Sequence, residues 1–377
     1  MIPETPILAE PRISAMRTFR CTCENMLFFD NSVCLRCHKE TGFCPACRAV
    51  VALLPRPEGG WTCGNAACGV TLLKCANYLQ YSACNRCVLA DEAAALPEPV
   101  LCDCCCFNQT IPDLTVPRYA EKWYRLESAK RRLFYDLDLL GLPYRFDEAD
   151  PRPKLRFDFK ADVVPKYCFL RPMGTKERVF TGHANGCITI NIREADDVER
   201  ERLRVDLGES HRTLIGHFRH EIAHYYWEVL IPGGDEEGCR AVFGDHQSPT
   251  YQEALDAYYK NGAPADWQER FVSAYASMHP WEDFAETFAT YLDMVSVLDT
   301  AHQVDFTHTP PRFGDFDAMV KQYKALGIGM NEINRSMGLL DLVPEVLVEP
   351  VRAKMRFIHD LIAAKSAATE SDTTPKG

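Results

Sequence analysis

The strongest periodic pattern of apolar residues lies between Pro117 and Gly141. Residues three, four and seven positions apart share one face of a helix, so this recurrence predicts an amphipathic helix over 117–140. The proline suits a first helical turn, and Gly141-Leu142-Pro143 ends the pattern. The apolar positions are Tyr119, Trp123, Leu126, Leu133, Leu137 and Leu140, and the charged back contains Lys122, Arg125, Lys130, Arg131 and Arg132. We interpret this segment as a scaffold helix that joins two domains.

Beyond residue 154 the pattern changes twice. "LRFDFKADV" and "GCITINI" alternate apolar and polar residues, which predicts strands. Residues 197–230 return to helical spacing, and further helical segments follow around 249–261, 266–277 and 281–299. Residues 315–365 have the pattern of helices broken at Gly338, Pro344 and Pro350, and the polar residues 366–377 are typical of a disordered tail. The sequence therefore predicts a mainly helical C-terminal domain with a small sheet.

Cysteine usage sets the N-terminal part apart, because 15 of the 18 cysteines fall between Cys21 and Cys106. The first residues contain no basic segment followed by an apolar one, so we expect a cytoplasmic protein without a secretion signal. In a reducing compartment, clustered cysteines indicate zinc rather than disulfides. We interpret the isolated Cys168, Cys187 and Cys239 as buried apolar thiols.

The spacing of these cysteines predicts structural zinc sites, because two thiols a few residues apart can bind one ion from a tight turn. Two quartets are well defined, and a third group offers seven thiols for four positions, so we expect two to three structural zinc ions. The first quartet is Cys21, Cys23, Cys34 and Cys37, and the second is Cys44, Cys47, Cys63 and Cys68. The third group contains Cys75, Cys84, Cys87, Cys102, Cys104, Cys105 and Cys106.

A second kind of metal motif lies in the helical region, where "HEIAH" places His220 and His224 one helical turn apart. Two imidazoles on one helix face can bind one zinc ion, and Glu221 can act as general base toward a zinc-bound water. Such a site needs a third protein ligand. The metzincin pattern is excluded, because Trp227 and Leu230 stand where it requires glycine and histidine.

The helix predicted within 279–294, "HPWEDFAETFATYLDM", supplies two glutamates one turn apart. We assign Glu282 as the third zinc ligand. We assign Glu286 as the carboxylate that accepts a hydrogen bond from a ligand histidine, an interaction that zinc-bound imidazoles usually make.

These motifs resemble the gluzincin branch of zinc peptidases, and among them the lethal-factor-like enzymes. Over about residues 17–300 the chain also resembles a bacterial family of metallopeptidases with a zinc ribbon. That resemblance rests on "NMLFFDNSVCLRCHKETGF", "CANY", "NQTIPDL", "TGHANGCITINI", "RTLIGHFRHEIAHYYW" and "SAYASMHPWEDFAETFATYLDM".

The resemblance implies further roles for particular residues. Tyr275 matches the tyrosine that lethal-factor-type enzymes present to the developing oxyanion, although Tyr258, Tyr259 or His279 could do the same. The third structural zinc site would use Cys75, Cys84, Cys102 and Cys105, with Cys87 as an alternative. The strand 187–192 is either an edge strand along the substrate cleft or an ordinary interior strand.

Together these observations predict an α+β protein with an N-terminal multi-zinc cysteine ribbon, a connecting helix and a zincin-like metallopeptidase domain. The expected parts are an N-terminal tail (1–16), the ribbon (17–110), the helix with a linker (111–154), the metallopeptidase domain (155–365) and a C-terminal tail (366–377). The expected function is zinc-dependent hydrolysis of peptide bonds, with one catalytic zinc ion and a ribbon that serves stability or docking of a substrate or protein partner.

The charge of the chain bears on the alternatives. A net charge of −11, and a ribbon region with nine basic and ten acidic residues in 1–110, weigh against nucleic acid as a partner. No apolar run approaches the length of a membrane span, so we expect no membrane association. The alternative function is a non-catalytic zinc-binding scaffold or protein-interaction module on a zincin fold.

Overall fold

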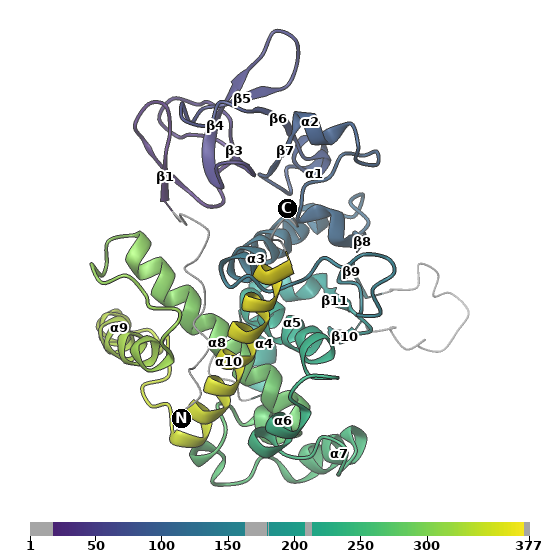
Figure 1. Ribbon diagram of the computed structural model, residues 1–377, viewed down its shortest axis with the longest axis vertical. Helices are drawn as coiled ribbons and strands as arrows, with labels where there is room; N and C mark the ends of the chain where they lie inside the picture. Colours follow the sequence, from purple (N-terminus) through teal and green to yellow (C-terminus); the bar gives the residue numbers. More distant parts are fainter. Residues whose placement is uncertain (1–17, 163–178, 180, 208–212, 373–377) are drawn as a thin grey trace. The chain divides into compact units, whose positions relative to one another are not determined.

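A computed structural model describes residues 18–162, 179, 181–207 and 213–372 of the protein (Figure 1). It has the α+β composition that the sequence predicts, with short strands around the cysteine clusters and long helices in the C-terminal part. Among the described residues, no helix is both long and apolar enough to cross a membrane. The predicted N-terminal tail and Cys168 lie outside the described residues.

The contacts divide the chain into two compact units. One, the ribbon-and-sheet unit, comprises the described residues of 18–135 and 154–218; the other, the helical unit, comprises those of 136–153 and 219–372. Two of the divisions fall within helices, at 135/136 in α3 (Tyr119–Leu139) and at 218/219 in α5 (Leu214–Leu230), and a third falls between residues 153 and 154. The predicted domain boundaries, which follow composition along the chain, stay a prediction.

The first half of the ribbon-and-sheet unit consists of short antiparallel strands interrupted by cysteine-bearing turns. The strands β1 (Thr18–Arg20) and β2 (Met26–Phe28) form a hairpin. A five-stranded sheet follows in chain order, with β3 (Thr41–Cys44), β4 (Ala49–Pro55), β5 (Trp61–Cys63), β6 (Thr71–Lys74) and β7 (Cys87–Leu89). The short helices α1 (Ala76–Tyr81) and α2 (Ala90–Ala93) flank β7 in the sequence.

A second sheet in this unit has the order β10-β11-β9-β8. Its strands are β8 (Asn108–Thr110), which follows the short turn η1 (Cys105–Phe107), β9 (Arg156–Lys160), β10 (Gly182–Ala184) and β11 (Cys187–Asn191). Because β11 pairs with β10 on one side and β9 on the other, the expectation of an edge strand at 187–192 is wrong, and the interior alternative holds. The turn η2 (Ile192–Ala195) and helix α4 (Asp197–Leu207) follow.

Helix α3 confirms the predicted amphipathic helix, and Trp123, Leu126 and Leu133 are fully buried. The predicted charged back is wrong in part, because Lys130 and Arg131 are also buried. Within the ribbon-and-sheet unit, Nζ of Lys130 lies 3.0 Å from the Glu127 carboxylate, and Arg131 donates to the carbonyl of Ala83 at 2.9 Å. A buried cation is tolerated when such partners replace its water.

The helical unit is built around α8 (Pro280–Gln303), against which α9 (Phe316–Ser336) and α10 (Glu349–Asp372) pack (Figure 1). The C-terminal part of α5 contributes aromatic rings to this core. Tyr226 stacks on Phe288 with ring centroids 5.5 Å apart, and Trp227 meets Phe284 edge-on with ring centroids 5.1 Å apart. Shorter helices complete the unit: α6 (Glu236–Phe243) and α7 (Tyr251–Asn261), with the turns η3 (Trp267–Glu269) and η4 (Tyr275–Ser277).

Several helical expectations need correction. The segment 266–277 contains only the two short turns η3 and η4, and α6 was not predicted. Pro350 does not break a helix but lies in the first turn of α10, where its missing N–H costs nothing. The backbone of α10 continues to Asp372, so the expected disordered tail does not begin at 366.

Candidate metal centres and active site

Helices α5 and α8 supply the residues of the histidine motif. His220 and His224 lie one turn apart on α5, and Glu282 and Glu286 lie one turn apart in the first half of α8. The start of α8 is fixed locally, because the ring of His279 accepts a hydrogen bond from the backbone N–H of Trp281 at 3.1 Å and Pro280 opens the helix. These contacts fix where α8 begins, two residues before Glu282.

Three ligand atoms from these helices form a small triangle. Nε2 of His220 lies 3.1 Å from Nε2 of His224 and 3.1 Å from Oε2 of Glu282, and the third side, His224 Nε2 to Glu282 Oε2, measures 3.5 Å. In a tetrahedral zinc site with bonds of about 2.0–2.2 Å, neighbouring nitrogen and oxygen ligands are about 3.3–3.6 Å apart. The donor set and its spacing therefore fit a zinc ion with one position left for water.

Glu286 and Ser273 hold one of these rings in place. Nδ1 of His220 lies 2.6 Å from Oε1 of Glu286, and the hydroxyl of Ser273 donates to Oε2 of the same carboxylate at 2.8 Å. This leaves Nε2 of His220 facing the triangle, which is the orientation that a zinc ligand requires. Ser273 was not predicted, since an isolated serine has no sequence signal for such a contact.

The electrostatics of the pair fit a cation site. Burial opposes protonation of His220, but its bonds to Glu282 and Glu286 raise its pKa well above the ordinary value. Burial also lowers the pKa of His224, with the charge of His220 contributing. Burial alone would raise the pKa of Glu282, yet the two histidines bring it far below the usual range. The two carboxylates therefore favour positive charge at His220, an environment that is compatible with a bound cation.

Aromatic residues flank the triangle. The centroid of the Trp281 ring lies 3.8 Å from that of the His224 ring, and the centroid of the Tyr275 ring lies 6.2 Å from that of the His220 ring. The hydroxyl of Tyr251 donates to Oε1 of Glu282 at 2.8 Å. Tyr251 was not predicted, because it lies on α7 and has no fixed spacing to the histidine motif.

The remaining candidates for chemistry lie in the same unit. Glu221 is buried, and its charge reaches Tyr251, whose pKa is raised by burial, by Glu282 and, less strongly, by Glu221. Burial, the charge of Glu282 and Tyr251 raise the pKa of Tyr275, so its hydroxyl keeps its proton as a donor must. Tyr259 is 70% exposed. His279 is occupied at the start of α8, and the ring of Tyr258 meets that of Tyr275 edge-on, with ring centroids 5.9 Å apart.

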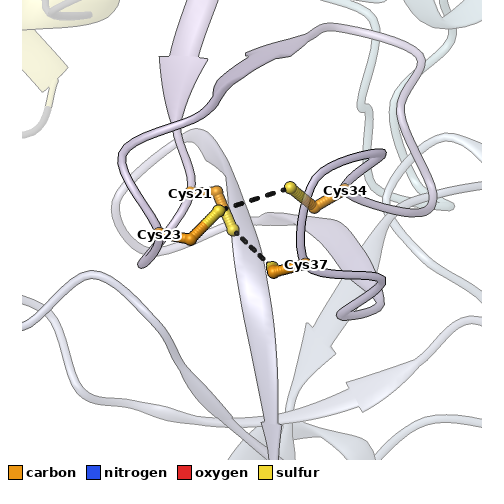
Figure 2. Close-up of side chains that lie close together, drawn as sticks. All are labelled: Cys21, Cys23, Cys34 and Cys37. Atoms are coloured by element: carbon orange, nitrogen blue, oxygen red, sulfur yellow. Dashed lines mark hydrogen bonds between the residues drawn. The ribbon is translucent and has the colours of Figure 1, made fainter.

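The ribbon cysteines form three tetrads of sulfur atoms. Figure 2 shows the first, in which Cys21 and Cys23 face Cys34 and Cys37, with Sγ–Sγ distances of 3.6 Å (Cys21–Cys37) and 3.7 Å (Cys23–Cys34). In the second tetrad, Cys44 and Cys68 are 3.9 Å apart and Cys47 and Cys63 are 3.7 Å apart. Four thiolates around zinc at about 2.3 Å are about 3.8 Å from one another, whereas disulfide sulfurs are about 2.05 Å apart. The tetrads therefore fit zinc and not disulfides.

The third tetrad contains four of the seven thiols in its group: Cys75, Cys84, Cys102 and Cys105. All four are buried, and backbone N–H groups donate to three of their sulfurs, from Arg86 to Cys84, from Cys105 to Cys102 and from Cys102 to Cys75, at 3.3–3.4 Å. Such bonds stabilise thiolates.

The other cysteines lie outside these tetrads. Cys87 and Cys104 are buried and Cys106 is exposed. Cys239 is buried as predicted. Cys187 is only half-buried and contacts Asp158, so its interpretation as a buried apolar thiol is wrong; it lies on a strand whose neighbour supplies a polar partner.

A chain that carries sulfur tetrads in one unit and a histidine–glutamate triangle in the other has the features of a zinc protein with a ribbon and a metallopeptidase-type site. Comparison with known families agrees. A family model described as "Putative zinc-binding metallo-peptidase" matches residues 119–361, and a zinc-ribbon domain model matches residues 18–116. Because the first match covers more than half of the chain, the protein belongs to this family of zinc-binding metallopeptidases, as the resemblance predicted.

Similar proteins occur in mycobacteria. The uncharacterized proteins Rv2568c of Mycobacterium tuberculosis and Mb2598c of Mycobacterium bovis are 38% identical over 357 residues, which span 92% of this chain and 95% of theirs. No solved structure matches the chain.

Proposed function

We propose that the protein is a zinc-dependent peptidase of gluzincin type, with His220, His224 and Glu282 as ligands of the catalytic zinc ion. The observation that carries this proposal is the triangle of two imidazole nitrogens and one carboxylate oxygen, which has the donor types and the spacing of a three-ligand zinc site. A bound zinc ion would polarise the substrate carbonyl and acidify a water molecule.

The side chains around the triangle would transfer the proton, stabilise the oxyanion and orient a ligand. Glu221 takes a proton from the attacking water and passes it to the leaving amine, as a general base and then a general acid. The protonated hydroxyl of Tyr275 donates to the oxygen that becomes negatively charged, and a donor of this kind contributes roughly a few kcal/mol to the transition state. Glu286 keeps the His220 ring oriented through the 2.6 Å contact.

For the ribbon we propose three structural zinc ions, one in each sulfur tetrad. Four protein ligands leave no position for a substrate, so these ions would stabilise short strands that bury little apolar surface. A peptide or protein is the proposed substrate, and a cytoplasmic location remains part of the proposal.

The test compares the wild type with Glu221→Gln and His224→Ala, measuring zinc content and cleavage of a mixed peptide library. Glu221→Gln should keep the full zinc content and lose about 10²–10⁴-fold in kcat, because only the general base is removed. His224→Ala should lose one zinc ion per chain as well as activity. If the wild type cleaves nothing while Glu221→Gln retains its metal, the non-catalytic scaffold becomes the better description.

A further inference from the structure

The other oxygen of the proposed ligand Glu282 faces the start of α7. There the hydroxyl of Tyr251 donates to Oε1 of Glu282 at 2.8 Å, while Oε2 of the same carboxylate faces the two histidine nitrogens. Glu282 itself is 2% exposed, so neither oxygen has ready access to bulk water. The two oxygens of one carboxylate are thus assigned to different partners.

Tyr251 is held firmly enough to direct that carboxylate. It is the first residue of α7, whose start is fixed by a capping box: Thr250 accepts from the backbone of Glu253, and Glu253 accepts from the backbone of Thr250. This arrangement satisfies two backbone donors at the helix start and orients the residues that follow.

The ring of Tyr251 is also packed against the start of α8. It lies edge-on to the rings of Trp281 and His279, with centroid distances of 5.5 Å and 5.4 Å. Trp281 in turn covers the ring of the second histidine ligand, His224. Tyr251 therefore contacts one proposed ligand directly and a second through one intervening ring.

We propose that Tyr251 is a positioning residue that holds Glu282 as a one-oxygen ligand and so keeps a coordination position available for water. A carboxylate can bind a metal through one oxygen or through both. A hydrogen bond to Oε1 favours binding through Oε2 alone, and partners of this kind tune both affinity and geometry at metal sites. This inference rests on the metal site of the proposed function and adds a residue to it.

The experiment uses the full-length protein, with Tyr251→Phe as the variant and Tyr259→Phe as its matched control on the same helix. Both changes remove only a phenol oxygen, but Tyr259 is 70% exposed. Zinc affinity at the histidine site is measured by competition with a chelator. The visible absorption of protein loaded there with cobalt(II) reports the coordination number, since its intensity falls as that number rises.

Tyr251→Phe should weaken zinc binding about tenfold and shift the cobalt spectrum toward a higher coordination number, while Tyr259→Phe matches the wild type. A Tyr251→Phe protein with wild-type zinc affinity and an unchanged cobalt spectrum overturns the inference, even if kcat falls, because Tyr251 would then act on the substrate. The inference is also overturned if Tyr251→Phe lowers the melting temperature equally with and without metal, since Tyr251 would then contribute only to packing.

These outcomes are separable from failure of the proposed function. If the wild type binds zinc at His220 and His224 but cleaves no peptide, the peptidase proposal fails while the metal and cobalt measurements still decide the role of Tyr251.

Discussion

The ribbon tetrads and the histidine–glutamate triangle differ in the type, number and origin of their potential metal ligands. Each tetrad gathers four sulfurs from turns, short strands or helix ends, and the first takes all four, Cys21, Cys23, Cys34 and Cys37, from turns and loops. The triangle takes two nitrogens from one helix and an oxygen from another helix far along the chain. Four ligands close a site, whereas three leave it open for chemistry.

The two kinds of site also differ in how their charge is balanced. Near the third tetrad, the buried ammonium group of Lys130 supplies positive charge. Burial alone would lower the pKa of Lys130, but Glu127, Cys104 and Cys105 raise it above the ordinary value. At the triangle, the anionic groups Glu282 and Glu286 are balanced by histidine. In the proposed function, this difference corresponds to a ribbon that serves stability and a triangle that serves reactivity.

The largest expected effect comes from breaking a tetrad, with Cys102→Ser in the fully buried third site. A structural zinc site of this kind can contribute about 10 kcal/mol, comparable to the whole stability of a domain. We expect a loss of one zinc ion per chain and unfolding of the ribbon-and-sheet unit, measured by metal analysis and near-ultraviolet circular dichroism. Cys106→Ser, at an exposed cysteine outside the tetrads, is the control and should leave both unchanged. Equal zinc content in both variants would remove the third site.

Mild chelation should separate the two kinds of site without a mutation. The open triangle should release its ion first, with loss of peptide cleavage, while the closed tetrads keep theirs and the fold persists. Zinc content and circular dichroism followed over the same time course check this order, and added zinc should restore cleavage. Release of all ions together would contradict the distinction between open and closed sites.

A smaller effect is expected from Glu286→Gln, which keeps the size of the side chain but removes the charge that faces His220 at 2.6 Å. Zinc binding at the triangle should weaken roughly tenfold, as is common when such a partner is changed. Competition with a chelator measures the affinity, and Glu237→Gln, an exposed position on α6, provides the control. Wild-type affinity in Glu286→Gln would show that the ring needs no carboxylate.

Much of the architecture could be predicted because it depends on local pattern. The period of apolar residues in 117–140 predicted α3, and alternation predicted β9 and β11. The burial of Lys130 and Arg131 could not be predicted, since it depends on Glu127 and on a carbonyl at Ala83, far away in the sequence. The interior position of β11 likewise depends on which strands pair with it, and alternation does not determine that.

The potential metal ligands could be recognised from the order of residues alone: pairs of cysteines a few residues apart, and two histidines with a glutamate on one turn of helix. These patterns span only a few residues, and the backbone geometry of a turn or helix fixes their spacing. Folding brings four of the seven thiols of the third group together, and it brings the hydroxyl of a tyrosine on α7 to a carboxylate on α8. Contacts between distant segments depend on packing and burial over the whole fold, so no local spacing carries them.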